Sequence, residues 1–306
     1  MSPSLRTRLR GAAPMSHRQA VLTMLLATLL WSMAGVVTLQ LESARSFEVT
    51  FWRSFFNAVA LLVLLPWLRG GAQLWRSIAG GGRTLWISGV CWSVMFTAFM
   101  LAMTLTTVAN VLVTMAIAPL LTALIARVVL GNRLPARTWI TVFVAGLGIA
   151  WMYGHEASGA DSRHLLGSIV ALGVPIAAAI NWTVIQGSRV QAGHDLLPAV
   201  LIGAVLSSLV TLPLSVPFSG SAHDVGWLAL LGVAQLAIPC LMSVAAARAL
   251  SAPEASLLAL LEIVFGVAWA WLAAHEAPAP HVLTGGLVVV GALAANEALA
   301  LRRRVA

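Results

Sequence analysis

The hydrophobic positions of the chain fall into ten apolar runs that are separated by short polar connectors. Runs of about 18–22 apolar residues, when helical, match the roughly 30 Å hydrocarbon thickness of a bilayer. The expected transmembrane helices are 20–39, 49–68, 85–103, 108–130, 138–153, 166–187, 196–215, 225–247, 254–273 and 282–301. Subtracting these spans leaves only connectors, so the pattern predicts an all-α integral membrane protein with a single membrane domain over residues 1–306.

Composition supports this class, because 60% of the residues are hydrophobic and only 9% are charged. A soluble protein of this size needs a more polar surface. The first run follows several arginines, as the hydrophobic part of a signal peptide does. It is too long for such a segment, and no small-x-small cleavage site follows it, so we expect a retained first helix. Cys91 and Cys240 lie inside predicted spans, where a disulfide is not expected.

The net charge of +8 comes from 18 basic residues, all of them arginine. With the N-terminus in the cytoplasm, fifteen of them fall on the cytoplasmic side: Arg6, Arg8, Arg10, Arg18, Arg69, Arg76, Arg83, Arg127, Arg133, Arg137, Arg189, Arg248, Arg302, Arg303 and Arg304. The opposite side holds Arg45 and Arg163. The positive-inside rule then predicts an even number of crossings with both termini in the cytoplasm, in a bacterial-type inner membrane. The charge is a topology signal, so we expect no nucleic-acid partner.

The ten spans form two sets of five with similar spacing, about 19–154 and about 165–301. A five-helix unit that starts inside the cell ends outside, so the second unit must enter the membrane inverted. Inverted repeats are typical of carriers that alternate access to a midplane site. An offset of 144 residues aligns the two halves, but hardly any residues match in that alignment, so spacing alone carries the repeat.

Several short motifs resemble the drug/metabolite transporter superfamily, specifically its ten-helix EamA-type exporters, from about Gln19 to Leu301. These motifs are Leu29–Ser32, Phe51–Ser54, Pro119, Leu130–Leu134, Leu261-Glu262 and His275-Glu276. Two positions depart from the family pattern, because Asn132 replaces its usual Glu and Ile263 its usual Pro. The tryptophan-rich sequence is also similar to the aromatic amino-acid exporter branch. The resemblance implies export of small metabolites, most specifically amino acids.

Ionisable groups inside the spans are the first candidates for function, because burying a charge in lipid is costly. Arg53 lies about one turn into the second span, where we expect a structural ion pair with Glu48 or Glu42. Glu262 lies about eight residues into the ninth span. It either bonds freed backbone on a neighbouring helix, or acts as a protonatable coupling group or a ligand for a substrate ammonium.

Further candidates for the lining of a substrate cavity are polar or bulky residues deep in the spans. The set comprises Trp31, Trp92, Met95, Asn110, Thr114, Asn181, Trp182, Gln186, Gln235 and Ser256, together with Glu262. Indole rings can stack on an apolar or aromatic substrate and donate a hydrogen bond. The alternative for the amides is ordinary helix–helix bonding, and for the methionines helix packing.

Interior prolines remove a backbone hydrogen bond and kink a helix. Pro119, Pro175 and Pro239 are therefore predicted hinges, with freed carbonyls near the midplane.

A secondary transporter with a cavity between the repeats is the leading function. The chain has no phosphate-binding Gly-x-x-x-x-Gly-Lys motif, so no nucleotide is expected to drive it. The alternatives are a drug or other metabolite carrier, a channel, and an intramembrane enzyme. The enzyme is disfavoured because all seven histidines lie in connectors or at helix ends. We expect neither a metal nor a cofactor.

Overall fold

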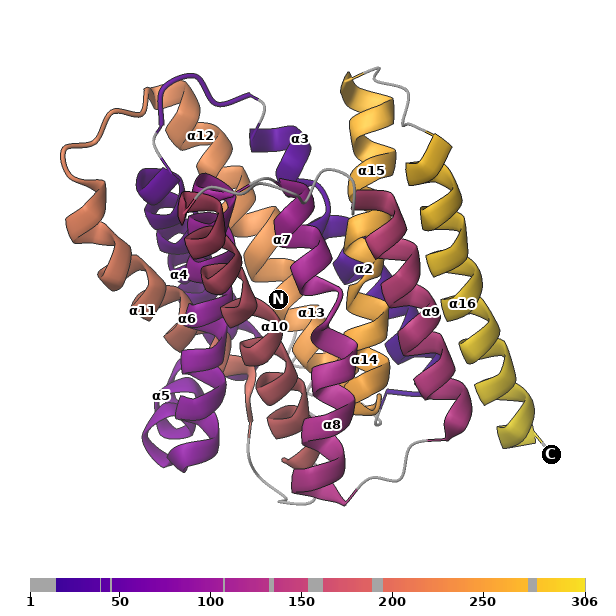
Figure 1. Cartoon of the computed structure of the whole chain (residues 1–306). Coiled ribbons are helices and arrows are strands. Elements are labelled where there is room, and N and C mark those ends of the chain that lie inside the picture. The colour runs from indigo at the N-terminus through magenta and orange to yellow at the C-terminus, as the bar shows by residue number, and fades with distance from the viewer. Residues whose placement is uncertain are drawn as a thin grey trace.

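The computed structural model describes residues 15–38, 40–44, 46–106, 108–131, 135–153, 162–188, 195–274 and 280–305, which form helices and connectors without a strand (Figure 1). The helices of the first half are α2 (His17–Trp31), α3 (Ala34–Thr38), α4 (Ser46–Arg69), α5 (Gly71–Gly80), α6 (Gly82–Leu105), α7 (Val108–Met115), α8 (Ala118–Leu130) and α9 (Ala136–Tyr153). The second half has α10 (Ser162–Gly187), α11 (Leu197–Ser215), α12 (Ala222–Leu230), the π-helix η1 (Leu231–Ala237), α13 (Ile238–Ala247), α14 (Ala252–Ala259), α15 (Leu261–Ala274) and α16 (Pro280–Val305).

Each of the ten predicted spans coincides with helix. Six segments are long and apolar enough to cross a membrane: His17–Thr38, Phe47–Arg69, Gly82–Met103, Leu165–Gly187, Leu197–Ser215 and Ala222–Ala247. Three shorter apolar helices are Ala118–Leu130, Ala136–Trp151 and Pro280–Asn296. The sequence prediction did not include α5, which lies in the connector between the second and third spans.

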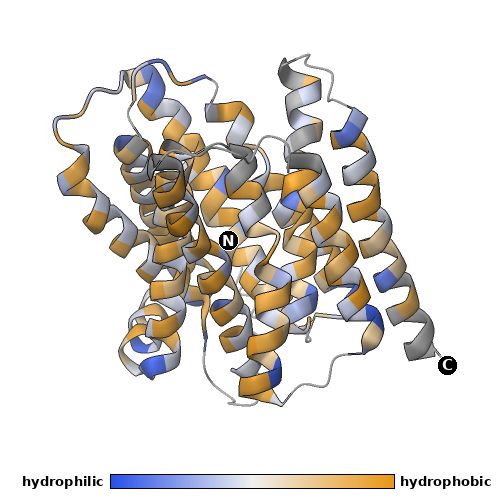
Figure 2. Cartoon of the chain, viewed as in Figure 1, coloured by the Kyte–Doolittle hydropathy of each residue, from blue (hydrophilic) through white to orange (hydrophobic). Residues whose placement is uncertain are grey.

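Many large apolar side chains point outward from the bundle. Val128 is 84% exposed and Leu287 75% exposed. Figure 2 shows hydrophobic residues along the length of the helices, with most hydrophilic residues toward the two ends of the bundle. A soluble monomer rarely exposes so much apolar surface, whereas a lipid-facing surface requires it.

Several of the predicted spans are interrupted. Ser32 and Met33 separate α2 from α3, residues 116–117 separate α7 from α8, and Leu260 separates α14 from α15. In the eighth predicted span the π-helix η1 widens the turn just before Pro239. Interrupted helices leave backbone groups that must find other partners, which membrane proteins tolerate only where the break is buried in protein or faces a cavity.

The two halves of the bundle make corresponding contacts. α6 packs on α10 as α2 packs on α13, and α11 packs on α6 as η1 and α12 pack on α4. Two further large interfaces, α4 with α11 and α9 with α16, pair equivalent helices. Displacing α7 by 144 residues gives 252–259, the bounds of α14. Such exchanged contacts are what two related halves produce when a two-fold axis relates them.

Glycines permit the closest of these contacts. A Cβ on Gly232 of η1 would lie 2.8 Å from both Arg53 O and Asn57 N of α4. At the corresponding interface, a Cβ on Gly203 of α11 would lie 3.0 Å from Gly89 O of α6. Both helix pairs therefore meet backbone to backbone, as small residues allow in membrane bundles.

Two buried carboxylates tie the halves together at the end of the bundle where α4 and α12 begin. Asp224 Oδ1 accepts from Glu42 N at 2.8 Å and Oδ2 accepts from Ser43 Oγ at 2.8 Å. Glu48 accepts from Ser219 N at 2.8 Å and from Gly220 N at 2.9 Å. The connector after α3 and the connector before α12 are thereby held against each other.

Candidate functional site: a cavity between the two halves

A cavity opens at the centre of the bundle, and both halves of the chain contribute to its wall. Its volume is about 120 Å³, several times the space that one buried water molecule needs. The interrupted segments supply residues at their breaks, namely Trp31 at the end of α2, Met115 at the end of α7, Ala118 at the start of α8 and Leu260 between α14 and α15. The breaks therefore face the cavity.

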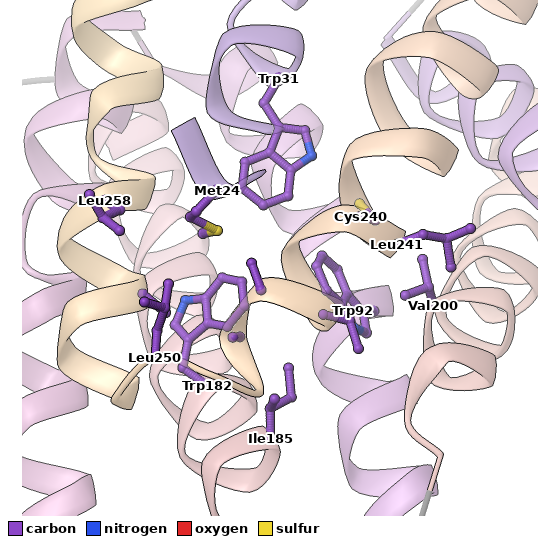
Figure 3. Packing of buried hydrophobic residues seen from close by; sticks show 14 of the residues in the cluster. Met24, Trp31, Trp92, Trp182, Ile185, Val200, Cys240, Leu241, Leu250 and Leu258 are labelled. Atoms are coloured by element: carbon purple, nitrogen blue, oxygen red, sulfur yellow. The ribbon is translucent and has the colours of Figure 1, made fainter. Parts of the chain in front are cut away.

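Three tryptophans form much of the apolar wall. Trp31, Trp92 and Trp182 project from α2, α6 and α10 around the same central region (Figure 3). The rings of Trp92 and Trp182 meet edge to face, with centroids 6.3 Å apart, and Phe96 packs beside Trp92 at 5.5 Å. Aromatic rings in this arrangement hold one another in place. The wall is rigid and can stack on a flat or apolar group.

One face of α6 supplies four lining residues: Trp92, Met95, Phe96 and Phe99. Their spacing of i, i+3, i+4 and i+7 places them on a single helical stripe. Val94 lies on the other side of the same helix and is 37% exposed. α6 therefore separates the cavity from the outer surface of the bundle.

Arg53 of α4 and Glu262 of α15 are the charged residues in the cavity wall. Arg53 is only 3% exposed, and Glu262 lines the same cavity. Among the described residues, no ion pair within 4.0 Å joins them. Glu262 stands in the first turn of α15, where the helix dipole favours a negative charge.

The predicted ion pair between Arg53 and Glu48 or Glu42 is wrong. Glu48 accepts hydrogen bonds from Ser219 and Gly220, and Glu42 Oε1 lies 4.0 Å from His223 Nδ1. Arg53 instead faces the cavity. Residues five apart on a helix, such as 48 and 53, do not share a face. The sequence spacing therefore already disfavours an ion pair between Arg53 and Glu48.

Several polar atoms around the cavity are buried without a hydrogen-bond partner in the described part of the chain. They are Arg53 Nε, Gln235 Oε1, Trp92 Nε1 and Ser256 Oγ. Gln235 uses its other amide atom, since Nε2 donates to Trp31 O at 3.0 Å and so satisfies a carbonyl at the end of α2. Buried polar atoms are nearly always paired. Unpaired donors and acceptors around one cavity indicate a place for a ligand or water.

Seven of the eleven predicted cavity residues line this cavity: Trp31, Trp92, Met95, Trp182, Gln235, Ser256 and Glu262. Asn181 and Gln186 lie outside the lining and join helices instead. Asn181 Oδ1 accepts from Ser88 Oγ at 2.6 Å, and Gln186 Oε1 accepts from Ala252 N at 2.6 Å. Thr114 is buried in α7 outside the lining, and the side chain of Asn110 lies outside the described residues.

The three predicted hinge prolines take different places. Pro175 lies inside the unbroken helix α10 and lines the cavity. Pro119 stands in the first turn of α8, directly after the break at 116–117, so it begins a helix and does not kink one. Pro239 begins α13 directly after η1, where its missing N–H cannot bond the carbonyl four residues earlier.

The cavity is closed toward the end of the bundle where α2 and α14 begin. Met24, Ile185 and Leu250 there are fully buried. His17 Nε2 contacts Glu254 Oε1, which joins the first turn of α2 to that of α14. Because α2 and α14 belong to different halves, this contact and the packed layer seal that end.

The charge at this closed end is basic. At this end of the bundle α2, α6 and α9 begin, α4, α8 and α13 end, and α5 lies (Figure 1). These helices and their ends carry Arg18, Arg69, Arg76, Arg83, Arg127, Arg137 and Arg248. They come from both halves of the chain. The alternation of helix direction therefore gathers residues that are far apart in sequence at one end.

The described residues include no group of three His, Cys, Asp or Glu side chains that could hold a metal ion. Together, the lipid-like outer surface, the interrupted helices and the internal cavity define a membrane carrier.

Comparison with known proteins gives the family. The EamA-like transporter family matches twice, over residues 18–154 and 165–296. The chain belongs to this family, within the drug/metabolite transporter superfamily, and is a membrane transporter of small molecules. Family members are transporters, not enzymes.

Comparison with solved structures gives 29 matching chains. One of them is a crystal structure with a TM-score of 0.73 at 17% sequence identity. The match covers 91% of this chain and 97% of the other chain. This likeness shows a shared fold. The search of curated proteins gave no match.

Proposed function

We propose that the protein is a secondary transporter that exports small metabolites, most specifically neutral or aromatic amino acids, by alternating access of the central cavity. The observation that carries the proposal is the cavity itself. It lies between the two halves, combines tryptophan walls with one positive and one negative side chain, and is sealed at one end. Such a site can hold a small solute away from both aqueous phases.

The proposed topology has ten crossings as two inverted five-helix repeats in a bacterial-type inner membrane, with both termini in the cytoplasm. The basic end of the bundle supports this orientation, because positive residues remain on the cytoplasmic side. The sealed end is then cytoplasmic, and the described state holds the cavity closed toward the cell interior. Rocking of the halves about the cavity exposes it to the cytoplasm in the other state.

A drug or other metabolite carrier of the same fold is the second candidate. The apolar share of the cavity wall favours it, since tryptophan, phenylalanine and methionine dominate the lining. Flexible methionines such as Met95 and Met115 suit varied ligands.

A counterflow screen tests the proposal. The purified protein is placed in liposomes loaded with unlabelled solute, and uptake of labelled phenylalanine, leucine, methionine or threonine is followed. We expect transient accumulation of at least one of them, above that in empty liposomes. If only drugs or sugars exchange, the amino-acid assignment fails and the carrier remains. If no solute exchanges in reconstituted protein that retains its fold, the transport proposal fails.

A further inference from the structure

Arg53 and Glu262 stand in one cavity but come from different halves of the bundle, on α4 and on α15. Both are enclosed by helices of membrane length, where an isolated charge is expensive. A direct ion pair would use the hydrogen-bonding capacity of both groups, yet no such pair within 4.0 Å is found among the described residues.

The guanidinium of Arg53 has donors to spare. Its Nε is buried and has no partner, and a guanidinium forms its best bonds with the two oxygens of a carboxylate. Glu262 in the same cavity wall is an acceptor, and the lining residues Gln235 and Ser256 each have an unpaired atom that can also accept, Oε1 and Oγ. An ammonium group has three donors and no acceptor. The hydrogen-bonding requirement of Arg53 is thus met by a carboxylate, and that of Glu262, Gln235 and Ser256 by an ammonium group.

We infer that Arg53 and Glu262 form a two-point clamp for the head group of a zwitterionic α-amino acid. Arg53 binds the carboxylate and Glu262 the ammonium. This inference rests on the proposed transport function and adds to it which groups of the substrate the cavity binds. The side chain of the amino acid lies against Trp31, Trp92 and Trp182, whose rings stack on apolar or aromatic groups.

The clamp makes specificity depend on two charges at once. An amine without a carboxylate leaves Arg53 facing a substrate with no anion, and an N-acylated acid leaves Glu262 without a cation. A charge that loses its partner in a buried site is strongly penalised. The lining contains no further charged residue, so the site also disfavours amino acids with charged side chains.

Because the clamp joins α4 of one half to α15 of the other, substrate binding also connects the two halves. A bound zwitterion neutralises both buried charges before the halves move. In the empty cavity Arg53 and Glu262, both among the described residues, are not joined by an ion pair within 4.0 Å. We therefore expect exchange of substrate to be faster than movement of the empty carrier.

Competition in the counterflow assay tests the clamp. Uptake of labelled phenylalanine is measured against unlabelled phenylalanine, phenethylamine, N-acetylphenylalanine and phenylalanine methyl ester. In the wild type we expect only the free amino acid to compete, with each derivative weaker by at least about tenfold, since a lost charge pair costs more than that factor. Equal competition by phenethylamine or N-acetylphenylalanine overturns the clamp.

Two substitutions assign the charges. Arg53→Gln should weaken phenylalanine while phenethylamine becomes an equal or better competitor. Glu262→Gln should likewise weaken phenylalanine, while N-acetylphenylalanine becomes an equal or better competitor. Arg53→Lys and Glu262→Asp keep the charge and should restore part of the wild-type preference. Matched controls are Arg76→Gln and Glu42→Gln at exposed positions, which should leave the preference unchanged.

A binding measurement separates failure of the clamp from failure of transport. Thermal unfolding of purified protein should shift upward with phenylalanine but not with any of the three derivatives, because only a ligand of the folded state stabilises it. If phenylalanine binds but does not exchange, the transport function fails and the clamp stands. If solutes without a zwitterionic head exchange as well as phenylalanine does, the clamp fails and the carrier stands. A uniform loss for all competitors in both glutamine variants also overturns the clamp.

Discussion

Asn181 and Glu262 are both polar side chains deep within the bundle, but their surroundings differ. Asn181 is fully buried and bonded to Ser88 across the interface of α6 with α10, whereas Glu262 lies in the cavity wall. From the sequence alone both were candidates for the cavity, because burial in a span is all that hydropathy reveals. Which helix face a side chain occupies decides between the two roles.

Asn181→Ala should therefore lower stability and leave substrate preference unchanged. The substitution removes the acceptor of the Ser88 hydroxyl and leaves that donor unpaired, at a cost of about 1–3 kcal/mol. Thermal unfolding in detergent, followed by intrinsic fluorescence, measures the loss. Ser88→Ala and the double variant complete a cycle, in which the double variant should lose less than the sum of the single ones. Additive losses, or a change in competition between substrates, contradict the structural role.

Much of the cavity wall was predictable at the residue level. Tryptophan deep in a span is conspicuous, and Trp31, Trp92 and Trp182 were all expected in the cavity and line it. Arg53 was assigned to a surface pair because Glu48 is near in sequence, although five residues on a helix turn the two side chains to different sides. That Arg53 shares a cavity with Glu262 of α15 could not be predicted from one sequence.

At the level of helices, the apolar runs predicted where helices lie but not where they are interrupted. The break between α7 and α8 is followed by Pro119, so the sequence carried a local signal. The break at Leu260 has no such signal, because no proline or glycine lies within three residues of it. Both α14 and α15 pack on α2, but α14 also packs on α8 and α10, and α15 on α3 and α16. The prediction also lacked α5, since a short helix on the surface of a bundle is too brief for a membrane span.

The contact of η1 with α4 offers a test at this level. Gly232→Ala should destabilise the protein by about 1–3 kcal/mol, as overpacking does, because the added methyl group would lie 2.6 Å from Phe56 Cβ and 2.8 Å from two backbone atoms of α4. These backbone atoms belong to Arg53 and Asn57, so the substitution should also weaken phenylalanine binding.

The matched control is Gly226→Ala on α12. A Cβ at Gly226 meets nothing within 4 Å, and alanine is the better helix former by up to about 1 kcal/mol. This variant should unfold at the wild-type temperature or above it. Equal unfolding temperatures for the two variants would show that η1 and α4 do not pack as closely as described.

At the scale of the whole molecule, the cavity is open to one side and sealed on the other. Met95→Cys, in protein whose own cysteines are replaced by serine, should react with a charged thiol reagent that cannot cross lipid, and substrate should slow that reaction. The control is Val94→Cys, which faces outward from the bundle and should stay unreactive in a bilayer. Reaction of both positions at one rate, with no effect of substrate, would contradict a water-filled substrate cavity.

The corresponding contacts of the two halves support the proposed alternating mechanism, because two related halves can form the sealed arrangement at either end in turn. Sequence spacing suggested this relation without matched residues, and the helix bounds agree with it at 144 residues. The ends of α2 and α14, joined through His17 and Glu254, must then separate for the cavity to open toward the basic end.

Locking that end is the most direct test of alternating access. His17→Cys and Glu254→Cys are introduced together into protein without other cysteines and joined by a short bifunctional thiol reagent. The same protein with a monofunctional reagent is the control. We predict that cross-linked protein still binds substrate but no longer exchanges it in counterflow, and that cleavage of the linker restores exchange. Undiminished counterflow through fully cross-linked protein would contradict the account.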